Sequence, residues 1–290
     1  MKAEILYRSQ CILGEGPIWH ADRKCCFWVD IERGILYEYN WLKKITKFWS
    51  FDYKLSLVIQ GRNNHLILGL NGGIARFDLE SENLEWLLDI ETEIADNRCN
   101  DGSCDSQGRL WIGTMQMQFK KSAGSLYCID KDLNIKKKLD KVSISNGIVW
   151  SLDNKRLYFI DSPTQVVQSY IFKEETGDIS FEKNGIQIPK KMGTPDGMTI
   201  DEEGMLWIAH WGGFGVYRWN PLDGKIVDKI DIPAPNVTSC TFAGPNLDHL
   251  VITTARENLK KEDLRGYPES GNTFVAKTNV KGVLANTCLI

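Results

Sequence analysis

The sequence predicts an all-β protein, a six-bladed β-propeller with four-stranded antiparallel blades around a central channel. Three observations predict this fold. One phrase recurs six times, the copies are about 45 residues apart, and the segments within each copy have the composition of β-strands. Six units of this length nearly fill the 290 residues. We therefore expect residues 1–290 to form a single domain.

The repeated phrase is a polar residue, usually followed by Gly, then an apolar triplet, a turn and an apolar-aromatic strand. Its successive starting positions are separated by 41, 45, 45, 50 and 43 residues, which is the length of a propeller blade. Four copies are clear and two are weaker. The clear copies begin at Glu15, Asp101, Asn146 and Asp196, and the weaker ones at Ser56 and Ser239.

Within each copy, short runs rich in Trp, Tyr, Ile and Val alternate with turn sequences such as Asp105-Ser-Gln-Gly and Asp201-Glu-Glu-Gly. Such runs predict strands joined by hairpins. One blade cannot bury both faces of its sheet, whereas a ring of blades covers them. A pair of β-sandwiches is the rival fold, but no segment resembles a linker. Helical periodicity is confined to 258–264, where we expect a short helix on a loop.

The composition limits the function classes. Basic and acidic residues, 35 and 38 in number, are spread along the chain and give a net charge of -3, so we expect neither a nucleic-acid nor a membrane partner. No apolar run reaches the roughly 18 residues of a membrane span, and the N-terminus lacks a signal-peptide pattern. We expect a cytoplasmic monomer or weak dimer. The eight cysteines form no CxxC pair and are expected to be reduced, buried thiols.

One repeat phase gathers polar residues. The first strand of each propeller blade lines the channel, so Glu15, Asp101, Asn146 and Asp196 are expected at one height around the axis. Each Asp-Gly or Asn-Gly pair is, by itself, an ordinary turn sequence. Together, however, three carboxylates and an amide would repel one another unless a cation lay between them. An oxygen-only ligand set suits calcium, magnesium or manganese, and an open site also accepts zinc or iron(II).

Six motifs cover nearly the whole chain: Leu13-Gly-Glu-Gly-Pro-Ile-Trp, Asn97-Arg-Cys-Asn-Asp-Gly, Gly108-Arg-Leu-Trp-Ile-Gly-Thr-Met, Ser145-Asn-Gly-Ile-Val-Trp-Ser, Pro195-Asp-Gly-Met and Thr238-Ser-Cys-Thr-Phe-Ala-Gly. These motifs resemble those of the SMP-30/gluconolactonase/regucalcin family. Details such as Trp211-Gly-Gly and Thr253-Thr-Ala-Arg resemble the bacterial sugar lactone lactonases more than the animal regucalcins.

The resemblance implies one catalytic divalent cation held by Glu15, Asn146 and Asp196. It also implies that Asn100, rather than the neighbouring Asp101, faces the site, and that Arg98 beside it hydrogen-bonds the sugar.

Several relatives place a substrate-binding glutamate shortly after the Gly-Thr-Met strand. This chain offers Gln116 and Gln118 there, which keep the hydrogen-bonding capacity without the charge and leave the preferred sugar open.

The implied activity is hydrolysis of a sugar (aldono) lactone to the aldonic acid. The metal would polarise the carbonyl, and Asp196 would act as general base and acid. Two alternatives remain open: phosphotriesterase or arylesterase activity at the same metal site, and a non-catalytic calcium-binding propeller. The chain has no Gly-x-Ser-x-Gly motif, and Gly212-Gly-Phe-Gly opens no predicted helix. A serine nucleophile and a dinucleotide site are therefore not expected.

The four histidines are dispersed over different repeats. Three of them, His20, His65 and His249, are expected to be structural or solvated. The fourth, His210, ends the strand that follows Asp196, so we expect His210 and Trp211 to form a possible wall of the pocket.

Overall fold

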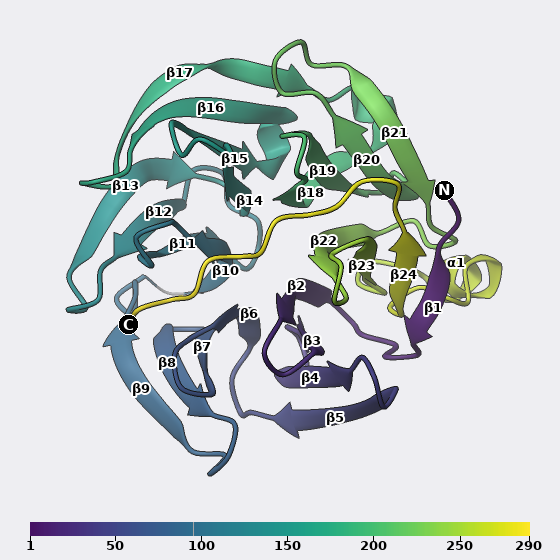
Figure 1. Cartoon of the computed structure of the whole chain (residues 1–290), viewed down its shortest axis with the longest axis horizontal. Helices are drawn as coiled ribbons and strands as arrows, with labels where there is room; N and C mark the ends of the chain where they lie inside the picture. Colours follow the sequence, from purple (N-terminus) through teal and green to yellow (C-terminus); the bar gives the residue numbers. More distant parts are fainter. Residues whose placement is uncertain (95) are drawn as a thin grey trace.

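The computed structural model describes residues 1–94 and 96–290. It confirms the predicted fold: six four-stranded antiparallel sheets are arranged as blades around a central axis (Figure 1). Blades 1 to 5 are each formed by four consecutive strands, whereas blade 6 combines strands from both ends of the chain.

Each blade runs from an innermost strand at the channel to an outermost strand at the rim. Blade 1 is β2 (Gly14–His20), β3 (Cys25–Asp30), β4 (Ile35–Asn40) and β5 (Ile45–Ser50). Blade 2 is β6 (Leu55–Gln60), β7 (His65–Leu70), β8 (Gly73–Asp78) and β9 (Leu84–Asp89). Blade 3 is β10 (Asn97–Cys104), β11 (Leu110–Gln116), β12 (Gly124–Ile129) and β13 (Ile135–Val142).

The second half of the chain repeats this order. Blade 4 is β14 (Ser145–Trp150), β15 (Arg156–Asp161), β16 (Val166–Lys173) and β17 (Asp178–Gln187). Blade 5 is β18 (Thr194–Ile200), β19 (Leu206–Trp211), β20 (Gly215–Trp219) and β21 (Ile226–Asp231). Blade 6 is β22 (Val237–Ala243), β23 (His249–Thr254), β24 (Thr273–Lys277) and, at its outer edge, β1 (Glu4–Tyr7). Three short helices complete the structure: η1 (Ser162–Thr164), η2 (Lys190–Met192) and α1 (Lys261–Gly266).

The N-terminal strand closes the ring. β1 pairs antiparallel with β24, with Ile5 opposite Phe274, and so completes blade 6. This pairing joins the two ends of the chain and hides the edge of β24 that would otherwise be exposed. The first copy of the repeat phrase begins at Glu15, and β1 lies outside it because a strand of four residues is too short to display the phrase.

The predicted repeat starts, at positions 15, 56, 101, 146, 196 and 239, all fall on innermost strands. In each of these six strands the pairing with the next strand shifts register near the predicted start, for example between Glu15 and Ile18 in β2 and between Asn146 and Ile148 in β14. Such a bulge re-aims one side chain of the strand. The common bulge explains why one repeat phase supplies the residues of the channel.

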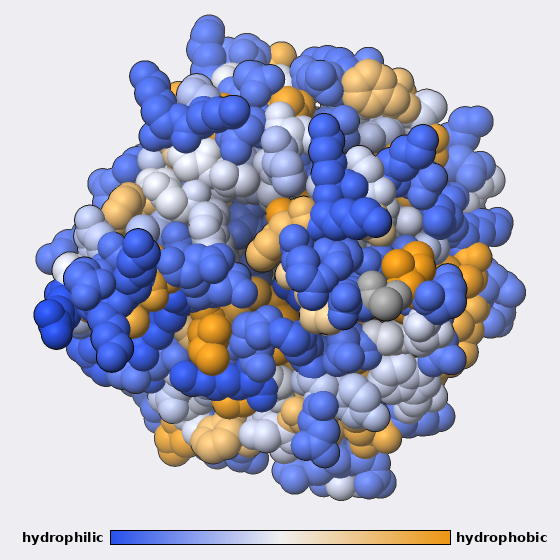
Figure 2. Space-filling model, turned by 180° about the vertical axis from the view of Figure 1, so that it is seen from behind, coloured by the Kyte–Doolittle hydropathy of each residue, from blue (hydrophilic) through white to orange (hydrophobic). Residues whose placement is uncertain are grey.

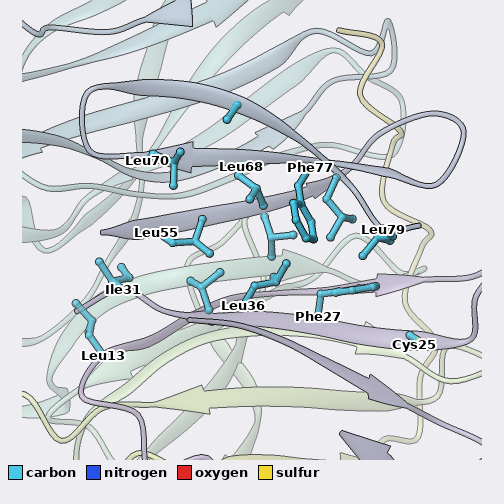
Figure 3. Packing of buried hydrophobic residues seen from close by; sticks show 14 of the residues in the cluster. Leu13, Cys25, Phe27, Ile31, Leu36, Leu55, Leu68, Leu70, Phe77 and Leu79 are labelled. Carbon is cyan, nitrogen blue, oxygen red and sulfur yellow. The ribbon is translucent and has the colours of Figure 1, made fainter. Parts of the chain in front are cut away.

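The hydrophobic core lies between neighbouring blades. Figure 3 shows Phe27 and Leu36 of blade 1 in one cluster with Leu55, Leu68 and Phe77 of blade 2, and all five are at most 1% exposed. Burying a side chain of this size stabilises the fold by about 1.5–3 kcal/mol. The alternating apolar residues of each strand thus bind the blades to one another and fix the ring.

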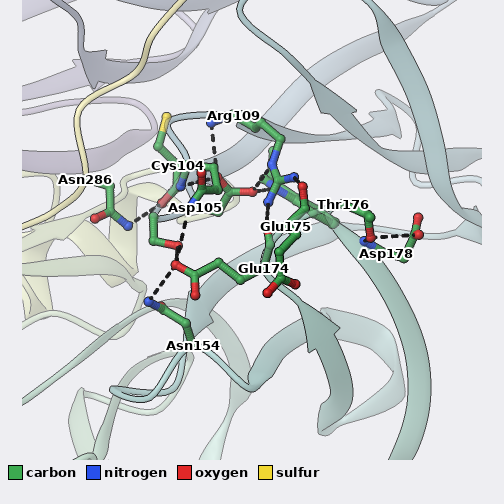
Figure 4. A network of polar contacts seen from close by, with 12 residues as sticks. Cys104, Asp105, Arg109, Asn154, Glu174, Glu175, Thr176, Asp178 and Asn286 are labelled. Carbon is green, nitrogen blue, oxygen red and sulfur yellow. Dashed lines mark hydrogen bonds and ion pairs between the residues drawn. The ribbon is translucent and has the colours of Figure 1, made fainter.

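The Asp-containing turns are structural. Asp105 is fully buried, and one of its oxygens accepts hydrogen bonds from the backbone of Gln107 and Arg109 (Figure 4). Its other oxygen accepts the indole N–H of Trp111 at 2.8 Å. Asp201 bonds Trp207 at 2.8 Å in the same way. The turn and the strand that follows it are therefore locked together by one carboxylate.

The C-terminal tail, residues 278–290, crosses the face of the ring that points toward the viewer in Figure 1. Its backbone donates to the carbonyls of Leu247 in blade 6, Gln60 in blade 2 and Gly108 after β10 at 2.8–2.9 Å. The side chain of Asn286 donates to the carbonyl of Cys104 (Figure 4). The tail thus covers this end of the channel and connects blades on opposite sides of the ring.

Two smaller expectations have structural counterparts. The predicted helical segment 258–264 overlaps α1, which is short and lies between β23 and β24. All eight cysteines are buried and free. Among the described residues, no helix is long and apolar enough to cross a membrane.

Candidate metal centre

A cavity of about 360 Å³ lies at the channel end away from the C-terminal tail. No tail residue lines it, and Figure 2, which views the molecule from behind Figure 1, shows a hollow near the middle of this face. We call it the site cavity. Its lining residues are Leu13, Glu15, Arg98, Asn100, Met115, Phe119, Ile144, Asn146, Ser162, Pro163, Gln165, Thr194, Pro195, Asp196, Trp211, Glu257 and Asn258.

Four innermost strands supply the polar wall of the site cavity. Glu15 comes from β2, Arg98 and Asn100 from β10, Asn146 from β14 and Asp196 from β18. All five side chains are at least nine-tenths buried. Residues up to 181 positions apart, from 15 to 196, therefore meet in one cavity because their strands occupy the same place in successive blades.

Asp101 is separated from this wall. It lines a smaller cavity of about 100 Å³ further along the channel, on the side of the C-terminal tail, together with Ala285 and Asn286. Its neighbour Asn100 lines the site cavity instead. The bulge between Cys99 and Gly102 accounts for the difference, because it turns these two consecutive side chains toward opposite ends of the channel.

Three predicted site residues lie outside the wall of the site cavity. Gln116, the last residue of β11, and Gln118, which is exposed, hydrogen-bond each other, and neither lines the cavity. His210 is fully buried inside blade 5, where its ring stacks on Tyr217 at 4.2 Å. The neighbouring Trp211 does line the cavity. Alternation along β19 explains this outcome, since successive side chains of a strand point to opposite faces.

The amide of Asn146 has a fixed orientation. The hydroxyl of Ser162, in η1, donates to the carbonyl of Pro195 at 2.7 Å. That hydroxyl therefore accepts from the side-chain nitrogen of Asn146, which lies 2.8 Å away. The amide oxygen of Asn146 is directed the other way, where the side-chain nitrogen of Asn100 donates to it at 3.1 Å. One acceptor site on this oxygen remains free for another partner.

Arg98 and Asn100 continue this network. Nη1 of Arg98 donates to the side-chain oxygen of Asn100 at 2.5 Å and to the carbonyl of Cys99 at 2.9 Å. Asn100 in turn donates to the carbonyl of Ser145 at 2.6 Å. Within the described structure, Nε and Nη2 of Arg98 have no hydrogen-bond partner at standard geometry. Arg98 lines the site cavity, so these two donors are available to a ligand.

The carboxyl groups destabilise one another in their charged forms. Burial raises the pKa of Glu15 to about 8, and nearby Asp101 adds to the shift. Burial, followed by the charges of Glu15 and Asp101, raises the pKa of Asp196 well above its usual range. Burial also raises the pKa of Asp101 to about 6. A positive ion among these groups would remove this penalty.

The donor set fits a divalent cation. Oδ1 of Asp196 is buried and has no hydrogen-bond partner, a costly state for a carboxylate oxygen. Glu15, Asn146 and Asp196 all line the site cavity. Nowhere in residues 1–94 and 96–290 do three or more His, Cys, Asp or Glu side chains group as a cation site. A site made here would combine two carboxylates with one amide, all oxygen ligands.

Sequence reasoning missed two residues of the site. Ser162 comes from the β15–η1 junction and contacts Asn146, and Glu257 comes from the segment between β23 and α1. Neither belongs to the repeat phase of the innermost strands. The only available signal was their proximity to the family motifs, which does not reveal where a side chain points.

Residues 13–256 match the family model described as the SMP-30/gluconolactonase/LRE-like region. The chain belongs to this family. A Sulfolobus acidocaldarius protein whose name states no function is 39% identical over 286 residues, covering 98% of both chains. The YvrE protein of Bacillus subtilis, whose name gives sugar lactone lactonase as its inferred activity, is 33% identical over 282 residues, covering 97% of both chains.

The fold of this chain is also found in solved structures. The calcium-binding protein regucalcin from Agrobacterium tumefaciens superposes with a TM-score of 0.94 at 26% identity, covering 99% of this chain and 98% of its own. The SMP-30/gluconolactonase/LRE-like chain thus shares the whole propeller with that protein. The family includes proteins named as lactonases and as regucalcins.

Proposed function

We propose that this protein hydrolyses a sugar (aldono) lactone to the aldonic acid with the help of one divalent cation held by Glu15, Asn146 and Asp196. The observation that carries the proposal is Oδ1 of Asp196, a buried oxygen without a hydrogen-bond partner. Asp196 lines the same cavity as Glu15 and Asn146, whose amide is oriented by Ser162. Membership of the family and the lactonase name of the Bacillus subtilis relative support the choice of substrate.

The oxygen ligands suit calcium, magnesium or manganese, and an open site of this kind also accepts zinc or iron(II). A bound cation would polarise the lactone carbonyl and stabilise the negative charge that develops on its oxygen. The protein's own task is then to place the lactone and to move one proton.

Asp196 is the residue to move the proton. A carboxylate at this position accepts a proton from the attacking water and returns it to the ring oxygen as the ring opens. Glu15 and Asn146 hold the cation in this scheme. Arg98 donates hydrogen bonds from Nε and Nη2 to substrate hydroxyls, and Asn100 keeps the guanidinium in place through its side-chain oxygen. Trp211 and Phe119 belong to the apolar part of the wall.

The direct test is acid release from a panel of aldonolactones, including gluconolactone and pentonolactones, corrected for spontaneous hydrolysis. Chelated protein is assayed alone and after reloading with calcium, magnesium, manganese, zinc or iron(II). We expect no activity above background without metal and recovery with at least one ion. Full activity in the chelated protein would overturn the metal-dependent scheme, and no activity with any ion would overturn the lactonase proposal.

A second function has specific support. The structure from Agrobacterium tumefaciens is described as that of a calcium-binding protein, so a calcium-binding role without catalysis is the competing proposal. Calorimetric calcium binding in a protein that hydrolyses none of the lactones would favour this alternative. A loss of lactone turnover in Asp196→Asn, relative to the native protein, would favour hydrolysis.

A further inference from the structure

The site cavity contains a charged residue that the proposed chemistry does not use. Glu257 lines the cavity on the side formed by the segment after β23. Its side chain is half-buried. No hydrogen bond or ion pair joins its carboxylate to another residue within the described structure. An acidic group in this position needs either water or a ligand as its partner.

The backbone fixes the place of Glu257. Its N–H donates to the carbonyl of Ile12 at 2.8 Å, and its carbonyl accepts from the side chain of Asn236 at 3.0 Å. Asn236 is itself buried. The backbone N–H and carbonyl of Glu257 are thus held by the segments that precede β2 and β22, so Glu257 is anchored at the cavity wall and is not part of a freely moving loop.

Arg98 is the cation of the cavity wall, yet it forms no ion pair with Glu257 within 4.0 Å. Each charge nevertheless acts on the pKa of the other. Burial raises the pKa of Glu257 and Arg98 opposes this shift, whereas burial lowers the pKa of Arg98 and Glu257 is among the carboxylates that oppose that shift. The other cation near Glu257, Lys54, is already paired with Glu32. The guanidinium of Arg98 can only donate hydrogen bonds, and the ionised carboxylate of Glu257 can only accept them. Both groups therefore line the same cavity without pairing with each other.

The charges of the wall indicate the charge of the ligand. Within residues 1–94 and 96–290, the charged side chains that line the cavity are Glu15, Asp196, Glu257 and Arg98. Three carboxylates and one guanidinium sum to minus two when ionised, which one divalent cation balances. No positive charge is left over for a phosphate or carboxylate on the substrate.

We infer that Glu257 is a specificity-determining residue that restricts the site to neutral lactones and repels anionic ones. This inference rests on the proposed lactonase function and narrows its substrate class. The cavity of about 360 Å³ lies at the small end of the range of roughly 300–1,000 Å³ for small-ligand sites. A sugar lactone is small enough to enter such a space, and Glu257 forms part of the wall that it meets there.

The same charge acts on the product. Hydrolysis converts a neutral lactone into an aldonate anion, whose new carboxylate meets Glu257 and the two other acidic groups of the wall. Repulsion between like charges in a partly desolvated site weakens binding. Glu257 therefore favours product release as well as selection of a neutral substrate.

The test compares two probes, glucono-1,5-lactone and its 6-phosphate, in the native enzyme, Glu257→Gln and Glu85→Gln. Glu85 is exposed on the outer strand β9 and serves as the matched control. We expect the native enzyme to prefer the neutral lactone in kcat/KM by about tenfold or more, and Glu257→Gln to reduce this preference at least fivefold. The Glu85→Gln variant should keep the native preference.

Two further readouts do not depend on that comparison. The preference of the native enzyme should shrink as salt rises from about 0.02 to 0.5 M, because salt screens the repulsion. Calorimetric titration should show that gluconate binds more tightly to Glu257→Gln than to the native protein. The gluconate titration measures binding alone, so it also applies to a variant whose turnover is altered.

Lactone hydrolysis with an unchanged preference and unchanged gluconate affinity in Glu257→Gln would overturn this inference and leave the proposed function intact. A native enzyme that turns over the phosphorylated lactone as well as the neutral one would do the same. If no lactone is hydrolysed with any metal, the proposed function itself fails, and the inference fails with it.

Discussion

The hydroxyl of Ser162 offers a precise test of how the site is held together. Replacing Ser162 with Ala removes the acceptor of the Asn146 side-chain nitrogen, which lies 2.8 Å away, and the link from η1 to the carbonyl of Pro195 at 2.7 Å. The fold should survive, because each of these two buried hydrogen bonds contributes about 0.5–1.5 kcal/mol. The amide of Asn146, however, loses the contact that directs its oxygen into the site cavity.

The expected effect on metal affinity follows from that loss. An unpaired buried amide nitrogen costs about 1–3 kcal/mol, and a rotated amide would present its nitrogen to the cation. Loss of an orienting partner of this kind typically weakens metal binding 10- to 100-fold. We therefore expect Ser162→Ala to bind calcium or manganese about 10- to 100-fold more weakly in calorimetric titrations of the chelated protein.

Ser169→Ala is the matched control. The hydroxyl of Ser169 is also buried in blade 4 and donates at 2.7 Å to Glu182, but it does not line the site cavity. Its loss should lower the free energy of unfolding without changing metal affinity. Native-like metal binding by Ser162→Ala, or equal weakening by Ser169→Ala, would refute the claim that Ser162 acts by orienting Asn146.

Three other predictions follow from the structure. First, burial raises the pKa of Glu15 from its ordinary 4.5 to about 8, so the folded metal-free protein holds a proton that the unfolded chain releases. Its melting temperature should fall as the pH rises from 4.5 to 8, and added divalent metal should stabilise it more at pH 8 than at pH 5; a metal-free melting temperature that rises over this range would contradict the assignment. Second, Asp196→Asn should reduce lactone turnover at saturating metal by about 100-fold or more, measured as acid release, because the amide cannot accept the proton. Turnover within a few-fold of the native rate would exclude Asp196 as the base. Third, a Cβ at Gly282 would lie 2.2 Å from Phe242, so Gly282→Ala should lower the free energy of unfolding by about 1–3 kcal/mol in denaturant titrations. An unchanged midpoint would show that the tail is not packed as described.

Much of the fold could be predicted because propeller blades repeat. The phrase that begins at positions 15, 56, 101, 146, 196 and 239 marks the innermost strands, and the structure confirms six blades that start there. The closing strand β1 could not be predicted in this way. It has four residues, and its partner β24 lies about 270 residues further along the chain.

The candidate site was predictable only where a residue belongs to the repeat phase. Glu15, Asn146 and Asp196 share that phase and line one cavity. The choice between Asn100 and Asp101 required the family resemblance, because a bulge of one residue reverses the direction of a side chain. The roles of these residues, as well as the expected cytoplasmic location and oligomeric state, stay predictions.

Residues outside the innermost strands were harder to place. The sequence suggested Gln116, Gln118 and His210 near the substrate, whereas the lining of the site cavity contains Ser162 and Glu257. Loop conformation and strand alternation decide which side chains reach the cavity. Neither can be derived from the spacing of residues along one chain.

The central claim is that Glu15, Asn146 and Asp196 meet around one cation at the open end of the channel. A crystal of the chelated protein reloaded with manganese, measured by anomalous diffraction, tests it most directly. We predict one strong peak in the site cavity, within roughly 2.0–2.6 Å of oxygen atoms of all three side chains. A peak held by other residues, or an empty site cavity at saturating manganese, would contradict the account.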